Sequence, residues 1–312
     1  MTSTSQETRR VVVLMGGRSA EREVSLNTGA QVTEALRSGG HDVLEVDAAA
    51  TDFIERVRDA APDAVFICLH GRYGEDGTVQ GLLELLDIPY VGSGVLASAL
   101  AMDKVMSKYF FEHAGLPTPD YVVLRCGDTV DIAEITRELG DRTVVKPANE
   151  GSAIGVTIAH APHELPAAID EAFIHDDTVL VERFVAGVEI TVGVLGNENP
   201  AALPTLEIVP ENEFYDYDAK YVPGLSRHII PARVSDEINA ECSRVALAAH
   251  LLLGCRGMSR TDVIVAEDGS IQLLEVNTIP GMTKTSLLPD AAAAAGIDFP
   301  DLCTRLVEYA LQ

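Results

Sequence analysis

The sequence predicts a mixed protein of the α/β and α+β classes, in which an open parallel sheet comes first and two α+β units follow. In the first third of the chain, short apolar runs alternate with helical stretches, which is typical of parallel strands joined by crossover helices. The middle third carries shorter strands around one helix, and from about Gly187 onward the strands become longer. We therefore expect three units, over residues 10–103, 104–186 and 187–312.

The first unit is expected to contain strands at 11–15, 42–46 and 64–69, with helices at 20–37 and 51–60. Gly16 and Gly17 follow the first strand and Ser19 can cap the next helix, so this turn is expected to present backbone N–H groups to a ligand. Two glycines alone are a weak motif. A loop at 70–77 is dense in turn-forming residues and leads to a helix at 78–86.

Helices around 98–113 open the second unit, whose strands are expected at 143–146, 156–158 and 179–183 with a helix at 163–173. In the third unit, an aromatic and acidic loop at 214–221 precedes a helix at 236–253 and a final hairpin. The sequence contains no internal repeat.

The chain is acidic, with a formal net charge of −25 over 312 residues. Because nucleic-acid backbones are bound by clustered Lys and Arg, this balance argues against a nucleic-acid partner. Apolar stretches at 245–253 and 291–297 are shorter than the ~18 residues that cross a bilayer, and residues 1–10 resemble a frayed tail rather than a signal peptide. We therefore expect a cytoplasmic protein without a membrane span, whose five scattered cysteines are reduced and mostly buried thiols.

Lysines are scarce, so any phosphate-bearing ligand has few ammonium groups to bind. The chain contains Lys104, Lys108, Lys146, Lys220 and Lys284. The strand that holds Lys146 is followed by Glu150-Gly151-Ser152-Ala153-Ile154-Gly155, and such glycine-rich loops let backbone N–H groups approach phosphate oxygens closely. This loop lacks the ending of a Walker motif, and an ordinary hairpin loop explains it equally well.

The strongest pattern lies between residues 260 and 277. Strand-like runs at 263–266 and 271–274 are joined at Asp268-Gly269, a dipeptide favoured in two-residue turns. If Glu267 faces Ser270, this register pairs Val263 with Leu274, Asp262 with Glu275, and Arg260 with Asn277. Side-chain alternation then places Arg260, Asp262, Glu275 and Asn277 on one face of the hairpin.

Two carboxylates directly opposite each other repel, and a divalent cation would remove that repulsion. Oxygen ligands from Asp, Glu and Asn are those that Mg²⁺ takes in phosphoryl-transfer sites. The same pattern is consistent with a solvated hairpin end whose charges are relaxed by Arg260. Beyond it, the turn-rich segment 278–287 is suited to binding a carboxylate, although its Pro280-Gly281 pair is also consistent with a simple turn.

Taken together, these segments resemble the D-alanine–D-alanine ligase family along nearly the whole chain. Any one of the matching stretches is weak, but their order along the chain is highly specific. They are Met15-Gly16-Gly17 with residues 19–25, Leu69-His70-Gly71 with Gly74-Glu75-Asp76-Gly77, Met102-Asp103-Lys104, Lys146-Pro147 with Glu150-Gly151-Ser152, Tyr215-Asp216-Tyr217 with Lys220-Tyr221, Arg260-Thr261-Asp262, and residues 275–278 with Pro280-Gly281-Met282-Thr283.

The resemblance implies that a two-lobed ATP-grasp fold follows the N-terminal domain. It implies a reaction in which ATP phosphorylates the carboxylate of one D-alanine before the amine of a second attacks, giving D-alanyl-D-alanine for peptidoglycan. The implied metal is Mg²⁺ or Mn²⁺, as two ions, bound by Asp262, Glu275 and Asn277, which agrees with the hairpin register above. The family is commonly dimeric, so a homodimer is expected.

The resemblance also assigns residues to ATP. Lys104 and Lys146 would contact its phosphates, and Lys220 would neutralise charge near the γ-phosphate. Adenine and ribose would be bound by Glu182, Phe184, Val185, Phe214 and Glu189. Without the resemblance, Glu182 and Glu189 would be ordinary exposed strand carboxylates. Lys108 receives no role and would serve as the control for a substitution of Lys146.

For the amino-acid substrates, the resemblance implies that Glu21 holds the amine of the first D-alanine and that His70 bonds its carboxyl group. Ser152 and Tyr221 would link to Glu21 and close the site, while Ser286 and the Leu287 amide would hold the carboxylate of the second D-alanine. Arg260 and the Gly281 amide would stabilise the oxyanion. By themselves, Glu21 is also consistent with a helix-dipole complement and His70 with an ordinary strand-end histidine.

Two positions depart from the family pattern: Ala153 stands where many relatives have a second serine, and Arg183 where some have lysine near adenine. The nearest competing function is that of a ligase that takes D-lactate or D-serine second, against which the Lys220-Tyr221 pair argues. Three more distant alternatives to D-alanine–D-alanine ligation also remain. They are a different ATP-grasp carboxylate–amine ligase, a nucleotide-binding regulator without catalysis, and an NAD-binding protein that uses Gly16 and Gly17.

Overall fold

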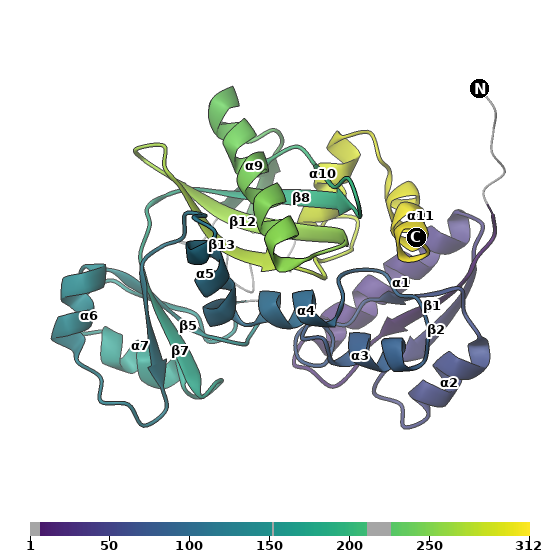
Figure 1. Ribbon diagram of the computed structural model, residues 1–312, viewed down its shortest axis with the longest axis horizontal. Helices are drawn as coiled ribbons and strands as arrows, with labels where there is room; N and C mark the ends of the chain where they lie inside the picture. Colours follow the sequence, from purple (N-terminus) through teal and green to yellow (C-terminus); the bar gives the residue numbers. More distant parts are fainter. Residues whose placement is uncertain (1–6, 152, 211–225) are drawn as a thin grey trace.

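The computed structural model describes residues 7–151, 153–210 and 226–312, and its first layer is a parallel three-stranded sheet (Figure 1). The strands are β1 (Arg10–Met15), β2 (Asp42–Asp47) and β3 (Ala64–Ile67), in the order β2-β1-β3. The helices of this part are α1 (Arg22–Ser38), α2 (Phe53–Ala60) and α3 (Thr78–Leu85).

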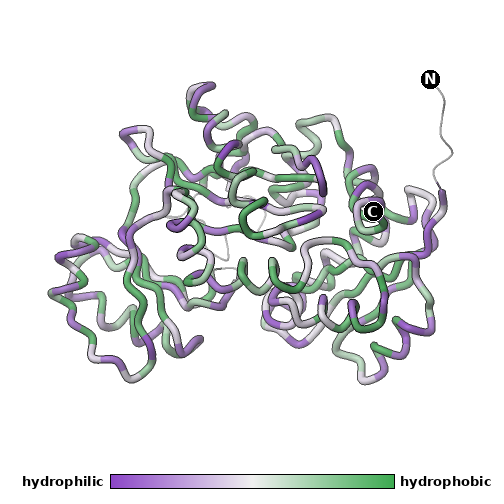
Figure 2. Tube along the Cα trace, in the orientation of Figure 1, coloured by the Kyte–Doolittle hydropathy of each residue, from purple (hydrophilic) through white to green (hydrophobic). Residues whose placement is uncertain are grey.

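Both faces of this sheet are buried, which explains why β1 is an unbroken apolar run. Val11 and Val13 pack in one core cluster with Val32 of α1, whereas Val12 and Leu14 belong to a second cluster with Val57 of α2. Successive residues of a strand point to opposite faces, so β1 supplies side chains to both layers of helices. Figure 2 shows this hydrophobic centre within hydrophilic outer loops.

The turn after β1 differs from the prediction. Ser19 is not the N-cap of α1, because the helix begins at Arg22 and its N-cap is Glu21. The Ser19 hydroxyl accepts from the Glu21 N–H at 3.3 Å and donates to the carbonyl oxygen of His70 at 2.8 Å. The backbone N–H of Gly16 donates to Ser25 Oγ at 2.8 Å and that of Gly17 to Asp47 Oδ1 at 3.2 Å. These two groups are therefore used inside the protein, which argues against dinucleotide binding at this turn.

Helices α4 (Val95–Met102) and α5 (Lys104–His113) lead from the first sheet to an antiparallel four-stranded sheet (Figure 1). Its strands are β4 (Tyr121–Arg125), β5 (Thr143–Pro147), β6 (Thr157–Ala159) and β7 (Thr178–Arg183), in the order β4-β7-β5-β6. Helices α6 (Ile132–Leu139) and α7 (Leu165–Ala172) pack on the face that carries Val145, Val179 and Val181. Lys146 and Glu182, which alternate with these valines, are thereby directed to the other face.

The third sheet is entirely antiparallel, with strand order β11-β10-β8-β12-β13 and β9 paired to β8. Its strands are β8 (Gly187–Gly196), β9 (Ala201–Ala202), β10 (Leu206–Pro210), β11 (Ser226–Ile229), β12 (Gly257–Ala266) and β13 (Ile271–Asn277). Helix α9 (Asp236–Leu253) covers one face, where Val245 and Ala249 pack in a cluster with Val192, Val263 and Leu273. The opposite face is left for the site.

The last two helices, α10 (Leu287–Ala294) and α11 (Phe299–Ala310), return toward the start of the chain. Leu302 and Leu306 of α11 belong to the same core cluster as Val11 and Val13, and α11 lies against α1 (Figure 1). Within the described part of the chain, no helix is long and apolar enough to cross a membrane. The three sequence ranges proposed as domains stay a prediction.

The hairpin of β12 and β13 corrects one expectation and confirms another. The predicted two-residue turn was wrong, because Ala266 rather than Glu267 bonds with Ser270, which leaves a three-residue loop ending at Gly269 with φ of 83°. Val263 consequently pairs with Leu273 and not with Leu274. A bulge between Asp262 and Val263 then restores the predicted pairs of Asp262 with Glu275 and Arg260 with Asn277.

Candidate active site

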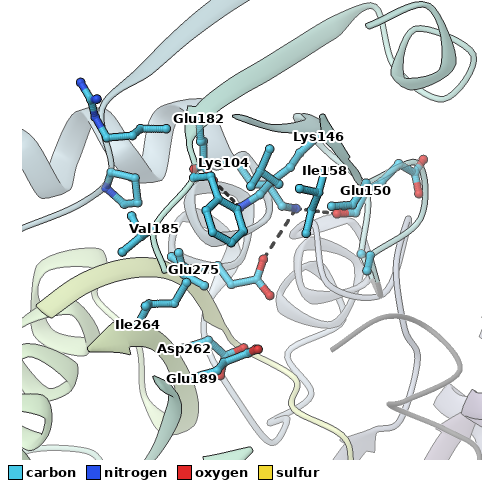
Figure 3. Close-up of a pocket in the computed structure, with 18 residues that line it drawn as sticks. Lys104, Lys146, Glu150, Ile158, Glu182, Val185, Glu189, Asp262, Ile264 and Glu275 are labelled. Carbon is cyan, nitrogen blue, oxygen red and sulfur yellow. Dashed lines mark hydrogen bonds and ion pairs between the residues drawn. The ribbon is translucent and has the colours of Figure 1, made fainter. Parts of the chain in front are cut away.

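A cavity of about 150 Å³ lies between the second and third sheets (Figure 3). Lys146 and Glu182 line it from β5 and β7, while Glu189, Asp262 and Glu275 line it from β8, β12 and β13. Lysines thus face carboxylates across the cavity. Such a distribution suits a ligand with a polyanionic part that is also bound to a cation.

The floor of the cavity is formed by side chains that strand pairing brings together on β8, β12 and β13. Asp262 pairs with Thr191 of β8 on one side and with Glu275 of β13 on the other, so the three side chains share one face. The bulge places Leu274 outside the regular pairing, and Leu274 also lines the cavity beside Glu275. One extra residue in β13 therefore supplies an apolar wall and an acidic group to the same face.

Asp262 is the more tightly held of the two carboxylates. Arg260 Nε and Nη2 donate to its two oxygens at 3.0 and 2.7 Å, and Thr191 Oγ1 donates to Oδ1 at 2.5 Å. The side chain of Asp262 is 9% exposed and that of Glu275 is 28% exposed. The predicted neutralisation of Asp262 by Arg260 is therefore present, but Glu275 lies outside that bidentate pair.

The donor set fits a hard divalent cation. Asn277 Nδ2 lies 3.3 Å from Asp262 Oδ2 and 3.4 Å from Glu275 Oε1, so one donor already bridges the opposed carboxylates where a cation would relieve their repulsion. Rotation of the same amide would offer its oxygen to that cation. Within the described ranges, no group of three or more His, Cys, Asp or Glu side chains is placed to hold a metal, and the third oxygen-bearing side chain beside the two carboxylates is the amide of Asn277.

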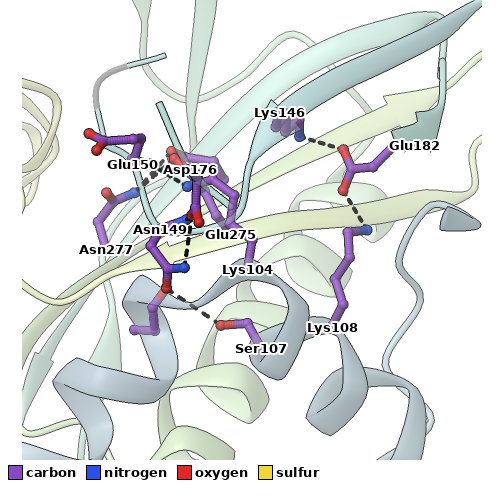
Figure 4. Close-up of polar contacts among 12 residues, drawn as sticks. Lys104, Ser107, Lys108, Lys146, Asn149, Glu150, Asp176, Glu182, Glu275 and Asn277 are labelled. Atoms are coloured by element: carbon purple, nitrogen blue, oxygen red, sulfur yellow. Dashed lines mark hydrogen bonds and ion pairs between the residues drawn. The ribbon is translucent and has the colours of Figure 1, made fainter. Parts of the chain in front are cut away.

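The opposite wall carries a buried chain of charges (Figure 4). Glu182 forms ion pairs with Lys146 through Oε2 and with Lys108 through Oε1, the latter at 2.7 Å. Burial alone raises the pKa of Glu182, but the two lysines outweigh that effect and the net direction is downward. Lys104 Nζ donates to the Glu150 carbonyl at 2.5 Å and lies 3.9 Å from Glu275, so it connects the glycine-rich loop to the floor.

One end of the cavity is apolar and aromatic. Phe184 and Val185 follow β7 and line the cavity with Ile264 and Leu274. The Arg142 guanidinium stacks over the Phe184 ring at 3.6 Å from its centroid, which fixes the orientation of that ring. A flat, partly apolar group is suited to this end.

The far side of the floor leads to a buried acidic and imidazole cluster. Glu21 is 4% exposed and His70 is 5% exposed. His70 Nδ1 lies 3.9 Å from Glu75 Oε1, and Glu75 Oε2 accepts from the Gly71 N–H at 2.7 Å. Burial lowers the pKa of His70, but Glu75 and Glu21 raise it and the net direction is upward. Two carboxylates and an imidazole therefore lie close together in a buried part of the protein.

The turn that leads into α10 is held together around Ser286. Ser286 precedes Leu287, the first residue of α10, and its hydroxyl lies 3.1 Å from the Thr283 N–H and 2.7 Å from Thr283 Oγ1. A side chain added at Gly281 would reach within 3.0 Å of Ser286 Oγ, so the 281–286 turn is close-packed. Backbone N–H groups at a helix N-terminus attract carboxylates.

Comparison with known proteins decides which family the chain belongs to. The family model described as the D-ala D-ala ligase C-terminus matches residues 110–308, and that of the N-terminus matches residues 48–93. The D-alanine–D-alanine ligase of Pelotomaculum thermopropionicum is 49% identical over 98% of each chain, and that of Desulforudis audaxviator is 52% identical over 97% of this chain and 98% of its own. This chain belongs to the D-alanine–D-alanine ligase family.

Solved structures of D-alanine–D-alanine ligases share this architecture. The Bacillus anthracis ligase complexed with ATP superimposes with a TM-score of 0.85 at 34% identity, covering 97% of this chain and 98% of that chain. The Coxiella burnetii ligase gives a TM-score of 0.82 at 28% identity over 98% and 95% of the two chains. The predicted fold, an open parallel sheet followed by a two-lobed ATP-grasp fold, is therefore confirmed.

The structure brings most of the residues expected from this family resemblance to one cleft. The ATP and metal candidates Lys104, Lys146, Glu182, Phe184, Val185, Glu189, Asp262 and Glu275 line the main cavity, and Asn277 lies beside Glu275. Four candidates, Ser152, Phe214, Lys220 and Tyr221, lie outside the described residues. Their expected roles stay predictions.

Two residues of the site were not predicted. Glu75 lies in the Gly-Glu-Asp-Gly stretch of the family motif, which carried the signal, but its contact with His70 depends on the fold of the loop. Lys108 was expected to be a neutral control for Lys146. That expectation was wrong, because Lys108 is buried and binds the same carboxylate as Lys146.

Proposed function

We propose that this protein joins two D-alanine molecules into D-alanyl-D-alanine, with conversion of ATP to ADP and phosphate. The observation that carries the proposal is the arrangement of the opposed Asp262 and Glu275 below Lys104 and Lys146 in a chain of this family. Phosphates need both cationic side chains and a metal that is held on the other side. The cavity has both sets of groups.

In the first step, the carboxylate of one D-alanine attacks the γ-phosphorus of ATP and ADP leaves. Glu21 binds the ammonium group of that D-alanine and His70 its carboxyl group, which the raised pKa of His70 favours. Lys104 and Lys146 hold the phosphates, while Phe184 and Val185 contact the adenine. Most of this contribution is positioning, because the chemistry lies in the substrates themselves.

In the second step, the amine of the other D-alanine attacks the acylphosphate carbonyl, loses a proton, and phosphate leaves. Ser286 and the Leu287 N–H hold the carboxylate of this D-alanine at the start of α10. Arg260 and the Gly281 N–H donate to the oxyanion that forms. Tyr221 and Ser152 would close the site over both substrates and exclude water from the acylphosphate.

We propose that Asp262, Glu275 and Asn277 hold Mg²⁺ or Mn²⁺, as two ions. When bound, the metal would neutralise charge on the β- and γ-phosphates. The three side chains would supply oxygen ligands to it, and Arg260 holds Asp262 in place. A homodimer is also part of the proposal, and light scattering on the purified protein would test it.

The decisive experiment is phosphate release with ATP and Mg²⁺ in the presence of D-alanine, either alone or mixed with D-serine or D-lactate, with the product identified by mass spectrometry. We expect release with D-alanine alone and D-alanyl-D-alanine as the product. Mainly D-alanyl-D-lactate would overturn the substrate assignment. A thermal shift with ATP and Mg²⁺ but no phosphate release with any substrate would favour a nucleotide-binding regulator.

A further inference from the structure

Lys108 is held on several sides behind the wall of the cavity. It extends from α5, its side chain is 1% exposed, and its ammonium group lies 2.7 Å from Glu182 Oε1. The same ammonium donates to Thr118 Oγ1 at 2.6 Å and to the Pro119 carbonyl at 3.1 Å. Glu182 and Lys146 line the cavity, whereas Lys108 reaches Glu182 from the rear (Figure 4).

The Thr118 hydroxyl fixes the direction of this contact. It donates to the Leu273 carbonyl of β13 at 2.8 Å, and a hydroxyl has only one proton to give. Thr118 must therefore accept from Lys108, which is a donor only. The lysine is thus anchored between the linker that precedes β4 and the strand that carries Glu275, and it cannot follow Glu182 if that carboxylate moves toward the cavity.

Glu182 is the carboxylate that the two lysines share. A buried carboxylate that met Lys146 alone would form a neutral pair and occupy the ammonium that faces the cavity. With Lys108 present, that carboxylate has a second ammonium partner on the side away from the cavity. Burial lowers the pKa of both lysines. At Lys146 the carboxylates of Glu182, Glu275 and Glu189 outweigh burial and raise the pKa, whereas at Lys108 the net direction is downward.

We propose that Lys108 is a positioning residue that neutralises Glu182 from behind the cavity and so leaves the charge of Lys146 available to nucleotide phosphates. The inference rests on the proposed function only in taking ATP as the ligand. It assigns Lys108 no contact with the nucleotide. Its effect should therefore be seen on phosphate binding and not on adenine binding.

The test compares ADP with adenosine by calorimetry, because adenosine lacks the phosphates. The ratio of the ADP affinity to the adenosine affinity isolates the contribution of the phosphates. It does so even where a substitution at Glu182 alters adenine contacts, because both ligands contain adenine. In Lys108→Met, which keeps the length of the side chain, we expect the ratio to fall by roughly tenfold or more, the size of one charge-assisted contact. Lys108→Arg should retain the ratio, and Lys284→Met at an exposed position serves as the matched control.

A second comparison separates charge compensation from a merely structural role and does not need Lys108→Met to fold. In the Glu182→Gln background there is no carboxylate to neutralise, so adding Lys108→Met should leave the ratio within about threefold of Glu182→Gln alone. A further tenfold loss there would overturn the proposal, as would an unchanged ratio in folded Lys108→Met. D-alanyl-D-alanine formation by the wild type is measured separately, so its absence would count against the proposed function and not against Lys108.

Discussion

Replacing Asp262 and Glu275 one at a time should have the same effect on catalysis but different effects on stability. Both residues are proposed to hold the metal, so Asp262→Asn and Glu275→Gln should each abolish Mg²⁺-dependent phosphate release. Their surroundings differ, however, because Asp262 is bound by Arg260 and Thr191 while Glu275 is more exposed. The metal-free protein should reveal that difference.

For Asp262→Asn, one of the two bonds from Arg260 meets an amide nitrogen, so a donor faces a donor. The guanidinium is only 12% exposed, and losing a charge-assisted hydrogen bond there costs about 1.5–3 kcal/mol. At roughly 2–4 °C per kcal/mol for a chain of this size class, the Tm should fall by about 3–12 °C. Thr191 can still donate to the remaining oxygen, which limits the loss.

For Glu275→Gln, two small effects oppose each other. The repulsion from the facing Asp262 disappears, which is worth about 0.2–1 kcal/mol. The ion pair with Lys104 at 3.9 Å also disappears, and such partly exposed pairs contribute about 0–1 kcal/mol. We therefore expect the free energy of unfolding to change by less than about 1 kcal/mol.

Scanning calorimetry in EDTA and phosphate release in Mg²⁺ supply the two measurements. If Glu275→Gln proves as destabilising as Asp262→Asn, or Asp262→Asn leaves the Tm unchanged, our account of the charges on the floor is wrong. Retained Mg²⁺-dependent turnover in either variant would instead refute the metal site.

Three further predictions follow from other parts of the cleft. Lys146→Ala should weaken ATP binding by about 1.5–3 kcal/mol in calorimetry, with Lys284→Ala as the exposed control, and equal ATP affinity would contradict the phosphate role. Ser286→Ala should raise the KM for the second D-alanine more than that for the first, and a rise confined to the first would reverse the two subsites. The Arg22 guanidinium holds the pKa of Asp47 well below its usual range, so this stabilisation is present above about pH 4 and is lost as the pH falls further. The difference in urea midpoint between Asp47→Asn and the wild type should shrink below that pH, and a difference constant with pH would rule the pair out as its cause.

The hairpin shows how far a sequence pattern can locate a site. Alternation and the Asp-Gly dipeptide predicted the pairing of Asp262 with Glu275, although the predicted loop was one residue too short. The bulge at Leu274 compensated for that error. A run of apolar residues contains no signal that shows which residue will stay unpaired between the two strands. The pairs at the functional end were predicted correctly because the bulge offset the error in the loop.

Other parts of the fold were missed for different reasons. Strand β4 and helix α6 carry local signals, an apolar run at 121–125 and an Asp131 cap whose side chain accepts from Glu134, and could have been predicted. The role of Lys108 could not have been predicted, because its contact with Glu182 joins two segments, α5 and β7, that lie far apart in the sequence. Local patterns indicate which residues are chemically able to act, and only the fold shows which of them meet.

The packing of α11 against β1 also has a consequence for synthesis. Val11 and Val13 leave the ribosome first, yet one of the layers that covers them includes Leu302 and Leu306, which emerge last. Until translation ends, the first sheet has an incomplete apolar cover, and contacts between such distant residues form slowly. A nascent chain that stalls before α11 would expose this surface, so the first domain to be made is among the last to be completed.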